Sequence, residues 1–172
     1  VSVEGITNIE PADINYAKEL GYVIKLLAVA KDYGDKGVNV RVHPVFLSKN
    51  HPLASVNDVF NAIFIRGNAI GDAMFYGRGA GSLPTASAVT ADIVSETRNL
   101  VSGTHSMVGC TCYNHRNFCP LEETESSYYV RLHVDDEPGV LGRIATAFGE
   151  SGVSLKSVIQ TRKVENHAEI VA

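Results

Sequence analysis

A cluster of closely spaced glycines is the first candidate for chemistry in this sequence. Gly77, Gly79 and Gly81 come just before the residues Ser-Leu-Pro-Thr. Glycines at this spacing let a backbone approach a ligand closely, and the start of a following helix offers unpaired N–H groups to an anion. Phosphate or ribose binding is therefore one interpretation. The spacing differs from the dinucleotide-binding fingerprint, so a tight strand-to-helix connection is an interpretation of equal weight.

A turn rich in acidic residues, Asp135–Gly142, is the second candidate. Pro138 suits the first turn of a helix, and Gly139 leaves room for a small ligand beside the backbone. Amide N–H groups at such a position can hold a carboxylate. A plain strand-to-helix turn explains the same residues, and the residues alone favour this simpler interpretation.

Three cysteines, Cys110, Cys112 and Cys119, lie close to His105 and His115. These are ligand types for soft metals, but the cysteine spacing is not a standard zinc pattern and a second cysteine pair is lacking. We therefore predict free thiols and no metal site, and the sequence indicates no role for the three cysteines. An odd count without a secretion signal indicates a reducing, cytoplasmic compartment.

Two isolated polar side chains complete the set. Lys25 is the one charge in the apolar run YVIKLLAVA, and it can extend to a strand edge or into a cleft. His43 lies on the polar side of an alternating strand, where histidine is usually structural or exposed to solvent. We assign neither a catalytic role. The sequence also contains no HExxH motif, P-loop or complete nucleotide-binding βαβ unit, so we expect no self-sufficient active site.

Alternating and helical patterns predict the elements that position these residues. The first part of the chain contains five strand-like runs and two helix-like runs. Strands are expected near residues 1–6, 22–30, 38–43, 61–66 and 72–76, and helices are expected from Pro11 to Leu20 and from Pro84 to about Leu100.

The last part of the chain has the order strand, helix, strand, strand. Residues 103–126 have no clear period and are rich in small polar residues, so we predict a linker there. The expected fold class is α+β. A mixed β-sheet with helices packed on one face covers residues 1–102, and a partial ferredoxin-like βαββ unit covers residues 127–172.

Composition limits the partners of this chain. It has 172 residues, a net charge of -4 and 45% hydrophobic residues, which is an ordinary globular balance. The charge gives no basic surface for nucleic acid or an acidic membrane. No apolar run reaches the roughly 18 residues that a membrane span needs. We expect no nucleic-acid partner and no membrane partner.

Several stretches together resemble the bacterial monofunctional homoserine dehydrogenases. They are VEGITNIEPADINYAKELGYVIKLLAVA, RVHPVFL and HPLASVNDVFNAIFIRGNAIGDAMFYGRGAGSLPTASAV, in the family's order. The stretch YYVRLHVDDEPGVLGRIATAFGESGVSLKSVIQ resembles the opening of an ACT domain. A complete ACT unit is βαββαβ, so the resemblance covers only its first four elements.

The resemblance implies an oxidoreductase that interconverts L-homoserine and L-aspartate 4-semialdehyde with NADP or NAD, leading to threonine, methionine and isoleucine. It implies a homodimer or tetramer, and a Rossmann domain ahead of Val1 in a longer protein. The family's catalytic lysine and aspartate lie on a helix upstream. We therefore assign no catalytic residue, and we expect the isolated chain to be inactive. The sequence does not indicate whether NAD or NADP is preferred.

The resemblance also assigns binding residues. The backbone of Gly79 and Gly81, with Gly77 ranked third, is expected beside the nicotinamide end of the cofactor. An amino-acid effector, for which threonine is the expected identity, is expected at the turn of the ACT part. The effector residues are Asp136, Gly139, Val140 and Leu141. The alternative function is an amino-acid-binding, dimerising ACT module without catalysis.

Overall fold

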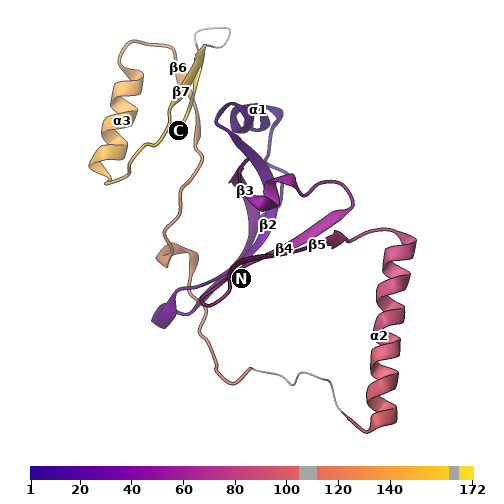
Figure 1. Ribbon diagram of the computed structural model, residues 1–172. Helices are drawn as coiled ribbons and strands as arrows, with labels where there is room; N and C mark the ends of the chain where they lie inside the picture. Colours follow the sequence, from indigo (N-terminus) through magenta and orange to yellow (C-terminus); the bar gives the residue numbers. More distant parts are fainter. Residues whose placement is uncertain (105–111, 163–166) are drawn as a thin grey trace. The chain divides into compact units, whose positions relative to one another are not determined.

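The long antiparallel pair of β2 (Tyr22–Asp32) and β3 (Val38–Ser48) forms the centre of the first part of the chain (Figure 1). The computed structural model describes residues 1–104, 112–162 and 167–172. Eleven residue pairs align the two strands around the turn η1 (Gly34–Lys36). The short strand β1 (Ser2–Val3) pairs in parallel with β3, so this sheet is mixed, in the order β1-β3-β2.

Helix α1 (Pro11–Glu19) begins where the sequence predicts and contacts β2. Pro11 occupies the first turn, where its missing N–H costs nothing. The Asp13 carboxylate accepts a hydrogen bond of 2.8 Å from the Glu10 N–H, which satisfies a donor at the start of the helix. Tyr16 and Ala17 are buried, so this face of α1 contributes the principal core of the first sheet.

The hairpin of β4 (Phe60–Gly67) and β5 (Gly71–Arg78) forms a second, two-stranded sheet. The α+β class is confirmed, but the strands of residues 1–102 form two sheets where one was expected. The turn η2 (Pro52–Ser55) and the left-handed Asp58 lie between β3 and β4. The chain therefore turns between the strand that ends the first sheet and the strand that begins the second.

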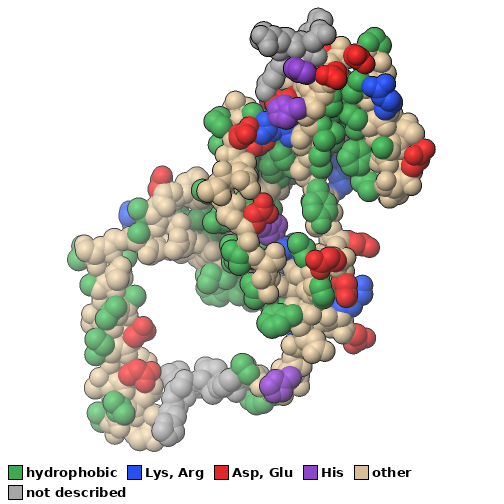
Figure 2. Space-filling model, turned by 180° about the vertical axis from the view of Figure 1, so that it is seen from behind, with side chains coloured by type: hydrophobic (Ala, Val, Ile, Leu, Met, Phe, Trp, Pro, Cys, Tyr) green, Lys and Arg blue, Asp and Glu red, His purple; other side chains and the backbone are tan. Residues whose placement is uncertain are grey.

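Helix α2 (Ser82–Ser102) follows the glycine cluster and ends at Gly103, which has the left-handed conformation common at helix ends. None of its residues is buried. Hydrophobic side chains are exposed along it, as the space-filling view shows (Figure 2). The most exposed are Leu83, Leu100 and Val101, each above 80%. This helix therefore presents an apolar surface that the described residues do not cover.

Part of the predicted linker docks on the turn between β2 and β3. Phe118 forms a parallel bridge with Val38, and the Val38 N–H donates to the Asn117 carbonyl at 2.8 Å. The Asn39 side chain is buried and donates to the Cys119 carbonyl at 2.9 Å. A segment predicted to be irregular thus adds a short edge to β3, and we call residues 116–119 the docked segment.

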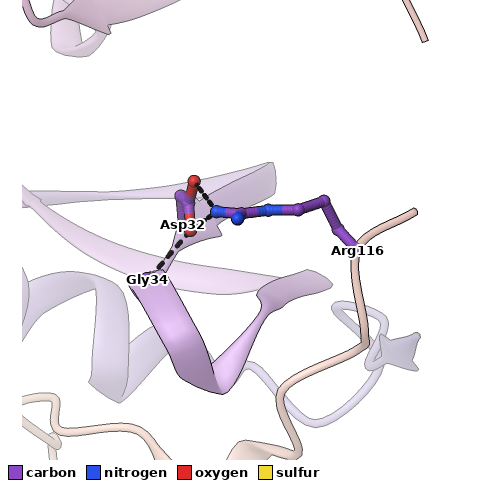
Figure 3. Close-up of polar contacts among 3 residues, drawn as sticks. All are labelled: Asp32, Gly34 and Arg116. Atoms are coloured by element: carbon purple, nitrogen blue, oxygen red, sulfur yellow. Dashed lines mark hydrogen bonds and ion pairs between the residues drawn. The ribbon is translucent and has the colours of Figure 1, made fainter. Parts of the chain in front are cut away.

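An ion pair joins the first residue of the docked segment, Arg116, to Asp32 at the end of β2 (Figure 3). The Arg116 guanidinium reaches the Asp32 carboxylate, which also accepts the Gly34 N–H at 2.8 Å. The hydrogen bond from Gly34, followed by that from Arg116, lowers the pKa of Asp32 from its ordinary value. Both side chains are about half exposed, so this pair adds less to docking than the buried Asn39 contact does.

The second part of the chain follows the predicted order of strand, helix, strand and strand. Its elements are β6 (Arg131–Asp135), α3 (Val140–Glu150), β7 (Ile159–Arg162) and β8 (His167–Val171). The three strands are antiparallel neighbours in the order β6-β8-β7. The side chains of Ala168, Ile170 and Val171 are buried, so the central strand β8 supplies most of the core.

The chain divides into two compact units, Val1–Leu121 and Glu122–Ala172. The division falls at η3 (Leu121–Glu123), within the predicted linker. Among the residues that the structure describes, no helix is both long enough and apolar enough to span a membrane.

The docked segment makes Gly37 intolerant of a side chain. A Cβ at Gly37 would lie 2.1 Å from the Asn117 oxygen, whereas a Cβ at Gly34 would meet nothing within 4 Å. We expect Gly37→Ala to release the segment and expose the buried Cys119. The readout is the rate of Cys119 modification by a thiol reagent, with Cys110 and Cys112 replaced by serine.

The expected rise is about tenfold or more, because each loss of about 1.4 kcal/mol in docking free energy makes opening tenfold more frequent. Gly34→Ala is the matched control, since it also has a positive φ but meets no neighbour. Equal modification rates in the two variants would contradict the docking.

Candidate functional site

The β4–β5 hairpin holds the glycine cluster in a defined register. Asn61 lies opposite Gly77 in the pairing of the two strands. Because side chains alternate across a strand, Asn61, Gly77 and Gly79 share one face of the ribbon. A shallow hollow of about 280 Å³ lies on this ribbon. Its lining residues are Asn61, Ala62, Ile63, Phe75, Tyr76, Gly77, Arg78 and Gly79.

The opposite face of the hairpin is held by aromatic contacts. The rings of Phe60 and Tyr76 stack with 4.9 Å between their centroids. The Arg78 guanidinium lies 5.1 Å from the centre of the Phe60 ring, a distance that suits a cation–π contact. The hairpin therefore fixes the position at which β5 passes into the glycine cluster.

The surroundings of Gly79 and the backbone conformation of Gly81 each require glycine. A Cβ at Gly79 would lie 1.8 Å from the Asn61 side-chain nitrogen, so the Asn61 amide occupies the space of a side chain there. Gly81 has a φ of +124°, which side-chain-bearing residues rarely adopt, and a Cβ would lie 3.2 Å from Pro84. Internal packing and backbone conformation thus account for these two glycines without any ligand.

Within the described residues, neither packing nor backbone conformation requires glycine at position 77. A Cβ there would meet nothing within 4 Å, and its φ is not positive. Glycine weakens a strand, and a glycine inside one often marks close approach by a ligand or another backbone. Gly77, which the sequence ranks third, is therefore the glycine whose bare backbone is open to an incoming group.

Helix α2 begins at Ser82, shortly after this open backbone in the sequence. Gly81 is the residue that caps the helix, and its carbonyl accepts the Thr85 N–H at 3.1 Å. The first N–H groups of a helix have no partner within the helix, and the first turn of α2 contains no acidic residue. An open glycine backbone followed by a helix start suits a ligand with a flat ring and an anionic group.

A larger hollow, of about 730 Å³, is lined by one face of α2 alone. A single helix cannot enclose a ligand, so this hollow is the open side of an apolar helix and not a second site in the described residues.

The four effector residues predicted in the ACT part lie on one turn. Gly139 is left-handed, with a φ of +89°, and it begins α3. A Cβ there would meet nothing within 4 Å. Asp136 is half-buried, and Leu141 is 38% exposed. Val140 is buried, so only its backbone can face a ligand.

The structure describes two of the three cysteines. Cys112 is exposed and Cys119 is buried, whereas Cys110 and His105 lie outside the described residues. Within those residues, no group of three His, Cys, Asp or Glu side chains is placed to hold a metal ion.

Two polar residues acquire partners that sequence reasoning did not identify. The Lys25 ammonium donates to the Val56 carbonyl at 2.6 Å and to the Asn57 side-chain oxygen at 2.7 Å. His43 accepts a hydrogen bond of 2.9 Å from the Arg41 side chain, which fits the structural role expected of it. A single lysine in an apolar run indicates that its ammonium needs polar partners. The sequence alone could not show that these partners lie about thirty residues later.

The three glycines are expected to respond differently to substitution by alanine. Gly81→Ala should lower the free energy of unfolding by about 1–2 kcal/mol, because alanine resists a positive φ. Gly77→Ala should leave it unchanged or raise it by up to about 1 kcal/mol, because alanine suits a strand better than glycine. Chemical denaturation followed by circular dichroism measures both changes.

Gly79→Ala tests the contact with Asn61. The single variant should be destabilised, and Gly79→Ala combined with Asn61→Ala should recover part of the loss, because the second change frees the occupied space. A Gly77→Ala variant as unstable as Gly81→Ala would contradict the open face at Gly77.

Comparison with known families identifies both parts of the chain. The homoserine dehydrogenase family matches residues 1–94, and the ACT domain family matches residues 128–171. These matches confirm the resemblance inferred from the sequence. The match over residues 1–94 also favours a dehydrogenase over a free-standing amino-acid-binding module.

Individual relatives agree with the family matches. The homoserine dehydrogenase of Synechocystis is 41% identical in an alignment of 182 positions, gaps included, that covers 99% of this chain and 41% of that protein. The homoserine dehydrogenase of Corynebacterium glutamicum is 42% identical in an alignment of 175 positions, gaps included, that covers 99% of this chain and 39% of that protein. The chain therefore spans about two fifths of the length of these relatives.

Solved structures of homoserine dehydrogenases are also similar to this chain. A crystal structure of a homoserine dehydrogenase from Thiobacillus denitrificans has a TM-score of 0.83 and 35% identity, over 98% of this chain and 39% of that one. The homoserine dehydrogenase of S. aureus at pH 6.0 has a TM-score of 0.64 and 30% identity, over 98% of this chain and 40% of that one.

Proposed function

Because the chain belongs to the homoserine dehydrogenase family, we propose that the protein carrying it interconverts L-homoserine and L-aspartate 4-semialdehyde with NADP or NAD. The observation that carries this proposal is the open backbone at Gly77, shortly before the start of α2 in the sequence. A bound nicotinamide would accept the hydride that leaves the alcohol carbon of homoserine. The residues of this chain bind and orient that ring.

The hollow on the β4–β5 ribbon suits one face of a planar ring. Gly77 gives a bare floor, and the Asn61 amide at its side can both donate and accept hydrogen bonds. Ile63 and Phe75 line the same hollow and add apolar surface to it. Pro84 has no N–H, so the backbone donors at the start of α2 that suit the negative charge of a phosphate are those of Ser82 and Leu83.

No residue of this chain is assigned a proton-transfer role. We propose that the catalytic lysine and aspartate lie upstream in the protein, with a Rossmann domain that holds the rest of the cofactor. The exposed side chains of Leu83, Ile93 and Leu100 on α2 support this, because an apolar helix of this kind needs a covering partner.

The same proposal includes the organisation of the protein. Residues 1–102 belong to the catalytic and dimerisation region, residues 103–126 connect the two parts, and residues 127–172 belong to a regulatory ACT domain. The protein acts in the cytoplasm as a homodimer or tetramer, on the route to threonine, methionine and isoleucine. The regulatory ligand is an amino acid, with threonine as the first candidate, bound at the turn around Gly139.

The protein expressed from the complete reading frame should oxidise homoserine with NADP or NAD, and residues 1–172 alone should not. Within the complete protein, Gly77→Val should raise the KM for the cofactor by about tenfold, which corresponds to about 1.4 kcal/mol of lost binding. Valine suits a strand, so it fills the floor without disrupting β5.

Ala73→Val is the matched control, because Ala73 shares that face of β5 but does not line the hollow. Steady-state kinetics with each cofactor measures the effect. An unchanged cofactor KM in Gly77→Val, or turnover by residues 1–172 alone, would contradict the proposal.

Calorimetry with threonine tests the regulatory part. Gly139→Asn should abolish saturable heat, because asparagine tolerates the left-handed backbone but fills the space beside it. Gly142→Asn, on α3, should retain the heat. Threonine binding by a complete protein without homoserine oxidation would instead support the alternative, a binding module without catalysis.

A further inference from the structure

Lys25 connects the first sheet to the loop that precedes β4. Its ammonium donates to the Val56 carbonyl and to the Asn57 side-chain oxygen, at 2.6 and 2.7 Å. Both partners are neutral, so the contact is a pair of charge-assisted hydrogen bonds and not an ion pair. The flanking residues Ile24 and Leu26 are apolar. The apolar run at the start of β2 thus carries one cation, Lys25, and that cation binds a loop.

The loop that Lys25 holds contains a backbone conformation of high energy. Within the described residues, Asp58 is the one residue other than glycine with a positive φ, at 55°. Such conformations persist where the surroundings constrain them. The Phe60 N–H donates to the Asn57 carbonyl at 3.1 Å, so the residue that Lys25 holds also closes the turn into β4.

The same loop contacts the glycine cluster. The Gly79 N–H donates to the Val59 carbonyl at 2.9 Å, immediately after the left-handed Asp58. Two residues further along, the Asn61 amide covers the face of Gly79. A continuous set of hydrogen bonds and short chain segments therefore connects Lys25, through residues 56–59, to the backbone beside the open floor at Gly77.

We propose that Lys25 is a positioning residue for the cofactor. It fixes the loop at residues 56–59 relative to the first sheet, and the loop in turn fixes Gly79 and the floor at Gly77. This inference rests on the proposed function, because the floor must receive the nicotinamide end of the cofactor. Lys25 itself touches no reacting atom and handles no proton.

The test uses the protein from the complete reading frame. In Lys25→Met the side chain keeps its length but cannot donate. We expect its KM for NADP or NAD to rise about tenfold, while kcat and the KM for homoserine change less than about twofold. Lys25→Arg restores a cationic donor and should recover most of the affinity. Calorimetric titration with the cofactor alone measures the affinity independently of turnover.

Two further variants make the result decisive. Lys31→Met is the matched control, because Lys31 lies on the same strand with its ammonium 4.8 Å from the centre of the Tyr33 ring. It should leave cofactor affinity unchanged. Asn57→Ala removes one of the two contacts and leaves the apolar strand intact, so it should weaken the cofactor even if Lys25→Met does not fold.

Four results for the variants would each overturn the inference. An unchanged cofactor affinity in Asn57→Ala, or in a folded Lys25→Met, excludes a positioning role, and so does an equal loss in Lys31→Met. A Lys25→Arg variant as weak as Lys25→Met excludes the hydrogen-bonding account. A wild-type protein that binds the cofactor but does not oxidise homoserine refutes the proposed reaction, and calorimetry still decides the role of Lys25.

Discussion

The antiparallel pairing of β2 with β3 is the constraint on which the first part of the structure depends. Eleven consecutive residue pairs fix the register from Tyr22 to Asp32. A slip of one residue would exchange the two faces of the strand. Helix α1 contacts β2, β1 pairs with β3, and the docked segment attaches at the turn between them. The Lys25 side chain connects the same strand to the loop before β4 by a hydrogen bond to the Val56 carbonyl.

This arrangement divides the contacts into strong and weak ones. The exposed pair of Arg116 and Asp32 lies in solvent, where screening and side-chain entropy offset most of the attraction. The buried Asn39 contact with Cys119 is different, because removing one partner would leave a polar group unsatisfied. The docked segment therefore depends on the interior of the turn more than on its surface.

Local pattern predicted most elements, since alternation and helix signals depend on neighbouring residues. Val38, Val40 and Val42 alternate as a half-buried strand does, and Pro11 marks the start of α1. Long-range contacts were not predictable in this way. Nothing in the sequence around Cys119 indicates a partner at Asn39, eighty residues earlier. Periodicity also does not report which strands pair, so the division into two sheets was not predicted.

In the candidate site, too, local pattern was predictable from the sequence and long-range contacts were not. The spacing of the three glycines identified the cluster, but the reason for each glycine depends on its surroundings. Asn61 explains Gly79, and a positive φ explains Gly81, so the structure assigns the open face to Gly77. The residues that set the loop before β4, Lys25 and Asn57, were separated in the sequence and met only in the fold. The site is therefore a property of the hairpin and its loop together.

The most direct measurement is a crystal structure of the complete protein with NADP bound. We expect the nicotinamide ring to lie within about 4 Å of the Gly77 backbone, which is ordinary contact distance. We also expect Lys25 to keep its hydrogen bonds to Val56 and Asn57. A nucleotide bound elsewhere, with the hollow at Gly77 filled by the protein's own side chains, would contradict the account.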